Sequence, residues 1–278
     1  MLSDKVKQHF NTAAQAEWER LDINEYYRLI FRLHLDFIKE ELAAKPRVLD
    51  AGSGPGRYAL EFAKRGCAVT LCDISDGELL LAEQKFGEND IAAERFVQTD
   101  LRDLNAFPDD AFELTVCYGA PLSYITENRE KAIAELIRVT RRGGTIAVSV
   151  NNTWGILRNA LGKTNESFFA NGDYWRIDEV VETGNCPSFE NVKFGGEADP
   201  EKHFFQPDEL MELMTNSGLS EVTLGAAPCL CSGNPAQYNK LAENPAAKAQ
   251  LEVLELKCYC DKNMIGFGEF LLAKGRRK

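Results

Sequence analysis

The sequence lacks long apolar runs. None of its segments approaches the ~20 apolar residues that a membrane-spanning helix needs. The charged residues at the N-terminus are not followed by the apolar stretch of a secretory signal. We therefore predict a cytoplasmic protein that makes no contact with a membrane. Its eight cysteines, in a chain of 278 residues, are then expected to be reduced thiols.

Positive charge is also scarce. The chain has 32 Lys and Arg against 43 Asp and Glu, and its formal net charge is −11. Proteins that bind nucleic acids usually meet the phosphate backbone with clustered Lys and Arg. The basic residues at 274–278 are explained more simply as a solvated chain end. The composition thus argues against a nucleic-acid partner and favours a small molecule, while the oligomeric state stays open.

Metal-ligand spacing is missing as well. The pairs Cys229/Cys231 and Cys258/Cys260 are separated by one residue, whereas paired zinc ligands are usually separated by two or more. Alternate residues of a strand share a face, so these thiols are expected to be small packing groups. A metal-binding or redox role is the alternative. We predict no metal site.

The sequence does contain a regular alternation of strands and helices. Helical patterns at 57–65, 78–86, 128–141 and 207–218 separate short apolar segments, and a further helical insertion is expected around 236–255. Such alternation is typical of an α/β fold with right-handed crossovers between parallel strands. The fold predicted is a doubly wound, Rossmann-like, mostly parallel seven-stranded sheet with helices on both faces. Its strands are expected at 47–51, 68–73, 94–100, 111–118, 145–151, 221–224 and 266–273.

The same pattern divides the chain into four parts. Residues 1–45 are expected to form an N-terminal helical cap, and 46–152 the cofactor-binding core. Periodicity weakens over 153–206, and so long an irregular stretch is typical of a lid or substrate insertion. Residues 207–278 return to the core.

A glycine-rich loop, 50–56, follows the first predicted strand. Doubly wound sheets bind ligands at the carboxyl ends of their strands, and glycines let backbone N–H groups approach a ligand closely. The spacing is G-x-G-x-G at Gly52, Gly54 and Gly56, whereas the pyrophosphate of a dinucleotide prefers G-x-G-x-x-G. A nicotinamide dehydrogenase is therefore the less favoured alternative.

Three acids stand at consecutive strand ends. Asp50 closes the first strand, Asp73 the second and Asp100 the third. A strand-end Asp is commonly just a helix N-cap. Three such acids in register with the glycines suit a nucleoside with an amino-acid tail instead. Asp73 would accept the ribose hydroxyls, Asp100 the adenine amine, and the loop backbone would hold the carboxylate.

These segments resemble the class I S-adenosylmethionine-dependent methyltransferases. Residues 48–57 resemble the family's first motif, and Asp73 and Asp100 match its second and third acids. Residues 112–118, 135–144 and 203–210 resemble the fourth strand, the helix before the fifth strand, and the start of the helix after the lid. The resemblance implies S-adenosylmethionine as cofactor. The implied cofactor-binding residues are Asp50, Gly52, Ser53, Gly54, Gly56, Asp73, Ile74, Asp100, Leu101 and Tyr118.

A looser resemblance links the chain to a bacterial subgroup of these enzymes with mostly unassigned substrates. It rests on residues 26–28, 54–58 and 119–124, and it adds Tyr27 and Arg28 to the expected cofactor site. The subgroup has a histidine where this chain departs from its pattern, and Tyr124 stands near that place.

Methyl transfer from a sulfonium leaves the protein mainly to position the reactants. Tyr118 is expected to form part of the wall beside the methyl group, since aromatic faces favour cations. A hydroxyl acceptor would need a general base, for which His203, Tyr124 and Tyr27 are candidates, although many enzymes of this type use none. The predicted lid is aromatic and suggests an apolar small-molecule pocket. Its aromatic residues are Trp154, Phe168, Phe169, Tyr174, Trp175 and Phe189, with Arg158, Arg176 and Lys193 as candidate partners of an acidic group.

The absence of an Asn/Asp-Pro-Pro-aromatic motif after the fourth strand argues against methylation of amino groups on nucleic-acid bases. No Pro-Cys pair follows this strand either, as it would in cytosine-carbon methyltransferases. Two alternatives to a small-molecule methyltransferase remain. One is a catalytically silent protein that binds the cofactor as a sensor or partner, and the other is an enzyme that catalyses a different reaction on the same fold.

Overall fold

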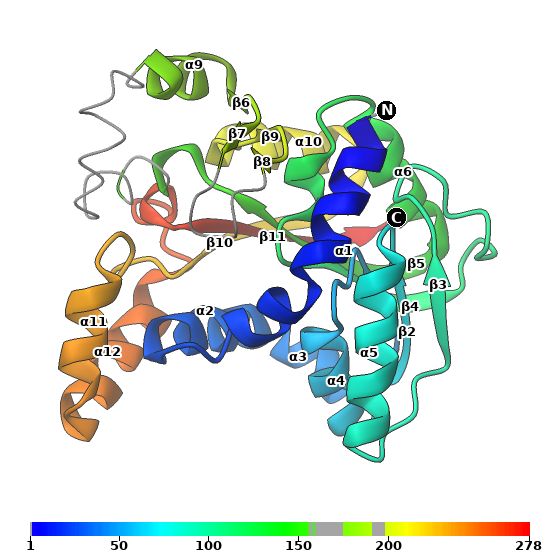
Figure 1. Ribbon diagram of the computed structural model, residues 1–278, viewed down its shortest axis with the longest axis horizontal. Coiled ribbons are helices and arrows are strands. Elements are labelled where there is room, and N and C mark those ends of the chain that lie inside the picture. Colours follow the sequence, from blue (N-terminus) through cyan, green and yellow to red (C-terminus); the bar gives the residue numbers. More distant parts are fainter. Residues whose placement is uncertain (1, 156–157, 159–174, 191–197) are drawn as a thin grey trace.

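A single mixed sheet organises the molecule in the computed structural model (Figure 1), which describes residues 2–155, 158, 175–190 and 198–278. Strand β11 runs antiparallel to both of its neighbours, and the other adjacent strands are parallel. This is the predicted doubly wound sheet. In spatial order its seven strands are β10 (Leu219–Ala227), β11 (Phe270–Arg277), β5 (Thr140–Asn151), β4 (Phe112–Cys117), β1 (Arg47–Ala51), β2 (Ala68–Asp73) and β3 (Arg95–Gln98).

Helices cover both faces of this sheet. The chain begins with α1 (Leu2–Arg20) and α2 (Glu25–Phe37), and Asn24 caps α2 by accepting hydrogen bonds from the next turn. The predicted C-terminal insertion is a helical pair that packs beside α2 (Figure 1). The remaining helices are α3 (Lys39–Ala43), α4 (Arg57–Lys64), α5 (Asp76–Glu88), α6 (Arg129–Val139), α9 (Trp175–Thr183), α10 (Pro207–Asn216), α11 (Pro235–Ala242) and α12 (Pro245–Cys258).

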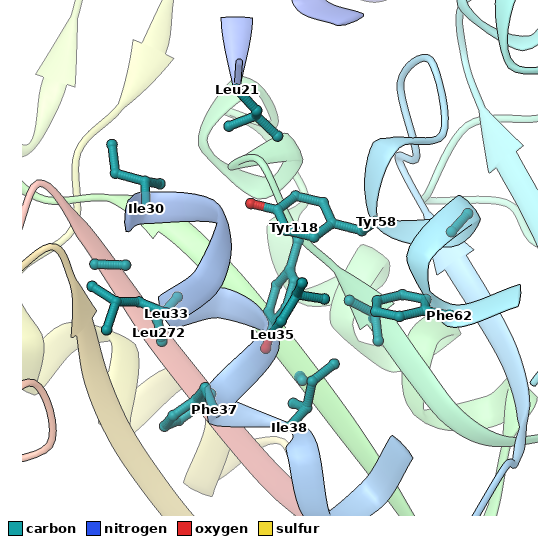
Figure 2. Close-up of a cluster of buried hydrophobic side chains, with 14 of the residues drawn as sticks. Leu21, Ile30, Leu33, Leu35, Phe37, Ile38, Tyr58, Phe62, Tyr118 and Leu272 are labelled. Atoms are coloured by element: carbon teal, nitrogen blue, oxygen red, sulfur yellow. The ribbon is translucent and has the colours of Figure 1, made fainter. Parts of the chain in front are cut away.

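Adjacent strand residues alternate between two cores. Val48 belongs to a cluster with side chains of α2 and α4, and Leu49 belongs to a cluster with side chains of α6 and α10. Successive side chains of a strand point to opposite faces, so a strand buried on both sides reads as continuously apolar. Figure 2 shows part of the first cluster, where Leu33 and Phe37 of α2 lie near Leu272 of β11.

Several predicted boundaries were wrong: the strand expected at 266–273 is Phe270–Arg277, and the boundary before the fifth strand differs as well. The sequence predicts a helix over 128–141 and a turn at Gly143–Gly144 before the fifth strand, but α6 ends at Val139 and β5 already begins at Thr140. The glycines fall within an irregularity of β5, where the register with β4 shifts between Phe112 and Leu114. A Cβ on Gly144 would lie 2.8 Å from the carbonyl oxygen of Glu113, so this glycine permits the close approach of β4.

The predicted cysteine strands are absent too. Cys229 and Cys231 follow β10 in a loop, and Cys258 ends α12. Both backbone N–H groups of the first pair donate to the buried carboxylate of Glu255, and the Cys229 thiol contacts the carbonyl oxygen of Met264 at 3.2 Å. In the described part of the chain no three His, Cys, Asp or Glu side chains are grouped so that they could hold a metal ion.

The segment predicted as a lid contains α9 and two short antiparallel pairs. The pairs are β6 (Asn185–Cys186) with β9 (Lys202–His203), and β7 (Phe189–Glu190) with β8 (Ala198–Asp199). Phe168, Phe169, Tyr174 and Lys193 lie outside the described residues, as do the side chains of Trp175, Arg176 and Phe189. The four-part division of the chain stays a prediction. Among the described helices none is long and apolar enough to cross a membrane.

Candidate active site

A cavity opens at the carboxyl ends of the central strands. The connections from β1 to β2 and β3 run to one side of the sheet, and β4 pairs with β1 on the other side. Ligands of doubly wound sheets bind at this point of reversal. Loops after β1, β2 and β3 form one side, which we name the glycine wall: Gly52, Ser53, Gly54, Asp73, Ile74, Asp100 and Leu101.

The glycine wall depends on an unusual backbone path. Gly52 has a φ of +70°, and its N–H donates to the carbonyl of Cys72 at 2.8 Å. A Cβ on Gly52 would lie 2.5 Å from Pro121 in the loop after β4. Only glycine combines this φ with so close an approach. Gly56, by contrast, does not line the cavity; it precedes α4, and a Cβ there would lie 2.9 Å from Leu71.

Asp73 fixes the loop above it. One carboxylate oxygen accepts from the backbone N–H of Gly54 and the other from that of Ser75, both at 2.8 Å. Burial raises the pKa of Asp73, and the backbone donors oppose the rise. Each oxygen keeps a lone pair, so the carboxylate can still accept from a ligand hydroxyl.

Asp100 is held by Arg102, two residues further along the chain. It accepts from the backbone N–H of Arg102 at 2.8 Å and pairs with the Arg102 guanidinium at 2.6 Å. Burial alone would raise the pKa of Asp100, but the bonds from Arg102 outweigh it and the pKa is lowered. The third predicted acid, Asp50, lies behind the cavity, where its carboxylate accepts from the N–H of Ala59 at 3.1 Å. Burial raises the pKa of Asp50 to about 7.

Three aromatic rings form the opposite side, which we name the tyrosine wall: Tyr58, Tyr118 and Tyr124. Tyr58 and Tyr118 meet edge to face with ring centroids 5.3 Å apart (Figure 2). Behind them lies His34, whose Nδ1–H donates to the carbonyl oxygen of Ile30 at 2.8 Å. The hydroxyl of Tyr118 is buried without a partner among the described residues, and this burial raises its pKa well above the ordinary value. Tyr118 therefore offers its ring to the cavity.

Helix α1 covers the cavity with side chains that the sequence analysis did not single out. We name them the roof: Val6, Phe10, Glu17, Arg20 and Leu21. Phe10 meets Tyr124 edge to face at 5.1 Å. The next residue, Asn11, accepts from the Ser75 hydroxyl at 2.6 Å and from the Gly77 N–H at 3.1 Å at the start of α5. The spacing of Val6, Phe10, Glu17 and Leu21 places them on one helical face, a signal that the sequence already contained.

Besides Asp50 and Gly56, three further predicted site residues do not line the cavity. The ring nitrogens of His203 lie 2.8 Å from Asn185 Oδ1 and 2.7 Å from Glu209 Oε1, so this histidine joins β9 to α10. Arg28 pairs with Glu25 at 2.6 Å on the outer side of α2. Tyr27 packs against Tyr26 and the core cluster. Because the buried face of α2 packs on the sheet, Tyr27 and Arg28 lie outside the cavity.

Of the nine lid side chains singled out by the sequence, those of Trp154 and Arg158 are described, and both lie outside the cavity lining. Arg158 stacks 5.0 Å over the ring of Phe267 and donates to its carbonyl at 3.2 Å, and Trp154 is partly exposed outside the cavity.

The residues present fit S-adenosylmethionine. Gly52 and Gly54 leave space where a side chain would otherwise stand, and Asp73 and Asp100 offer acceptors for hydroxyl and amine donors. Glu78, which the sequence analysis also missed, is buried in the lining and has no partner for either carboxylate oxygen within the described residues. Acidic groups of this kind suit a ligand with a positive charge.

Known proteins with related sequences match the same part of the chain. Residues 48–144 match the methyltransferase domain family. A ubiquinone/menaquinone biosynthesis C-methyltransferase of Shewanella pealeana is 32% identical over 126 residues, which are 43% of this chain and 49% of that protein. A tRNA 5-carboxymethoxyuridine methyltransferase of Escherichia coli is 29% identical over 129 residues, 46% of this chain and 49% of the relative. The chain thus spans about half the length of the curated relatives it matches.

A solved structure extends the likeness to the whole fold. The magnesium protoporphyrin IX methyltransferase of Synechocystis, solved with bound S-adenosylhomocysteine, is 16% identical, with a TM-score of 0.56 over 100% of both chains. Its fold is therefore similar to the fold described here. Residues 48–144 of this chain thus match a methyltransferase domain, and the chain has a Rossmann-like fold similar to that of the solved methyltransferase.

Proposed function

We propose that the protein transfers a methyl group from S-adenosylmethionine to a small-molecule acceptor. One observation carries the proposal: the glycine wall, with its strand-end acids, and the tyrosine wall face the same covered cavity. A cofactor held by the first wall would present its reactive end toward the second. The methyltransferase relatives support the reaction type.

The glycine wall would hold the cofactor. In this proposal Asp73 accepts the ribose hydroxyls, and Asp100 with Leu101 and Ile74 surrounds the adenine. Gly52, Ser53 and Gly54 would approach the amino-acid part with their backbone. Asp50 and Gly56 would act indirectly, since Asp50 anchors the start of α4 and Gly56 allows α4 to pack on β2.

The tyrosine wall would position the acceptor. When bound, the cofactor supplies an electrophilic methyl group on a sulfonium. In-line displacement requires the acceptor atom to lie on the side of that methyl opposite the sulfur. The rings of Tyr118 and Tyr124 offer aromatic faces that stabilise positive charge, and side chains of α1 line the same cavity. His203 is tied to Asn185 and Glu209 outside the lining, so we do not assign it a proton-transfer role. Catalysis would then rest on position and electrostatics.

A small acceptor is favoured over a nucleic acid. The relative that acts on tRNA keeps that class open as a competing outcome, but the chain has a net charge of −11 and the cavity is covered by α1. Phosphate backbones require clustered cations. A cytoplasmic location stays a prediction from the sequence.

The test is transfer of a labelled methyl group. Purified protein is incubated with S-adenosylmethionine labelled at the methyl, and with either a panel of small metabolites or total tRNA. Label in a small molecule, with release of S-adenosylhomocysteine, is expected. Label in tRNA would overturn the choice of acceptor. Tight cofactor binding without turnover over a broad panel would favour the silent sensor or an enzyme of another reaction type.

A further inference from the structure

Glu78 occupies an uncommon position for a carboxyl group. It stands in the first turn of α5, where its backbone N–H donates to the Ser75 hydroxyl at 3.0 Å. The residue is 1% exposed, and within the described chain neither carboxylate oxygen has a hydrogen-bond partner. Its carboxyl carbon lies 3.9 Å from the point where a Cβ on Gly54 would stand. A buried carboxyl group without a partner destabilises the folded protein, which suggests that a ligand supplies the missing partner.

The other charges of the cavity lining are already paired. Arg20 pairs with Glu17 at 2.9 Å, Arg57 with Asp22 at 2.7 Å, and Arg102 with Asp100 at 2.6 Å. Asp73 is satisfied by the backbone donors of Gly54 and Ser75. Asp22 lies outside the lining, so two of the four lining carboxyl groups, those of Asp73 and Glu78, have no guanidinium partner. The surplus carboxyl that also has no hydrogen-bond partner within the described chain is that of Glu78.

This surplus matches the charge difference between substrate and product. S-adenosylmethionine carries a sulfonium, an ammonium and a carboxylate, and so has one net positive charge. S-adenosylhomocysteine has lost the sulfonium charge and is neutral overall. We propose that Glu78 makes the cavity select the cationic cofactor over its neutral product, so that loss of the methyl group also weakens binding and favours product release. This inference rests on the function proposed above.

Binding of the cationic cofactor is coupled to loss of a proton from Glu78. Three charged groups face Glu78: Asp73 from the end of β2, and Glu17 and Arg20 from α1. Burial, followed by repulsion from Asp73 and Glu17, raises the pKa of Glu78 to about 9 in the empty cavity, against a smaller opposing effect of Arg20. Below that pH the carboxyl is protonated. A bound cation favours the ionised form, so binding S-adenosylmethionine should release a proton, whereas binding S-adenosylhomocysteine should release less.

The sign of the pH dependence follows. Below pH about 9, the affinity for S-adenosylmethionine relative to S-adenosylhomocysteine should rise with pH, by at most about tenfold per unit. At pH values where the α-amino group is protonated in both ligands, it cancels in this ratio. Only a titrating group that responds to the sulfonium charge remains.

The experiment is isothermal titration calorimetry on the full chain with three ligands: S-adenosylmethionine, S-adenosylhomocysteine and 5′-methylthioadenosine, which is neutral and keeps the ribose. Titrations in two buffers of different ionisation enthalpy report the protons released. Glu78→Gln resembles the protonated acid in shape, so it should fold with an unchanged or higher Tm. We expect it to lower the ratio of S-adenosylmethionine to S-adenosylhomocysteine affinity by about tenfold, to remove the proton release, and to flatten the pH dependence.

A matched control is Glu83→Gln, which removes the same charge from an exposed site of the same helix outside the lining; it should leave the ratio unchanged. Equal weakening of all three ligands by Glu78→Gln would assign Glu78 to the ribose and overturn the proposal, as would an unchanged ratio. If wild-type protein binds none of the three, the proposed cofactor itself is wrong. Failure of the selectivity alone leaves that function intact.

Discussion

The glycine wall and the roof enclose the same cavity but are fixed by different means. The glycine wall is attached to three parallel strands, and its acids are bonded to backbone N–H groups or to a neighbouring guanidinium. The roof belongs to α1, which meets α5 through polar contacts such as Asn11 with Ser75 and Lys7 with Asp76 at 2.8 Å, and which packs Trp18 against the core cluster. Strand-bound groups are held with less freedom than groups on a helix attached by exposed bonds. The fold thus keeps one side of the cavity rigid and leaves the other easier to displace.

The largest effect is expected from Gly52→Val, which tests the rigidity of the glycine wall. Its Cβ would lie 2.5 Å from Pro121 at a φ that valine does not tolerate, so the loop must move and cofactor binding should be lost. Calorimetry with S-adenosylhomocysteine measures the loss. Gly87→Ala is the control, because no heavy atom lies within 4 Å of the added Cβ. Retained affinity in Gly52→Val would mean that the loop is as adaptable as the roof.

A second prediction concerns His34, behind the tyrosine wall. Burial lowers the pKa of His34 to about 4, below its ordinary value of 6.5. The folded protein keeps it neutral, whereas the unfolded chain takes up a proton first. Stability should therefore decrease as the pH falls from about 6.5 toward 4, by about 3 kcal/mol in total. Urea unfolding over this range should show a shallower decrease for His34→Gln than for the wild type, and parallel curves would contradict the prediction.

Asp73→Ala tests a single member of the glycine wall. It removes an acceptor for the cofactor and frees the N–H groups of Gly54 and Ser75, so cofactor binding should weaken by about 1–3 kcal/mol. Asp103→Ala, an exposed acid near the same edge but outside the lining, should leave the affinity unchanged. An unaltered affinity in Asp73→Ala, measured by calorimetry, would exclude Asp73 from the cofactor site.

The smallest effect is expected at the roof. Asn11→Ala removes the bonds to Ser75 and Gly77 and should cost about 1 kcal/mol of stability, because the Gly77 N–H can bond water instead and the buried Ser75 hydroxyl still accepts from the N–H of Glu78. Cofactor dissociation, followed by stopped-flow fluorescence, should become faster. Thr12→Ala, which loses only a bond within α1, serves as control. If Asn11→Ala slowed or left unchanged the dissociation, the roof would not be the displaceable side.

The sequence predicted which residues of the glycine wall would lie together, but of the roof it predicted only an N-terminal helical cap and none of its side chains. Strand order and the acids at strand ends follow from local alternation and from the shared edge of parallel strands, so Asp73 and Asp100 could be placed together in advance. The position of α1 over the cavity depends on contacts such as Asn11 with Ser75, 64 residues apart, which no local pattern specifies. A different reason applies to Arg28 and His203: each has a suitable side chain, but a partner nearby in the sequence, Glu25 or Glu209, binds it outside the cavity.

Adjacent residues of α1 have different partners. Phe10 touches Tyr124 on the side assigned to the acceptor, and Asn11 holds the start of α5 on the side assigned to the cofactor. A change of α1 that reshapes the space for an acceptor must therefore also alter how long the cofactor stays. Substitutions in α1 would change the range of acceptors and the residence time of the cofactor together. Evolutionary selection on one of these properties would therefore also change the other.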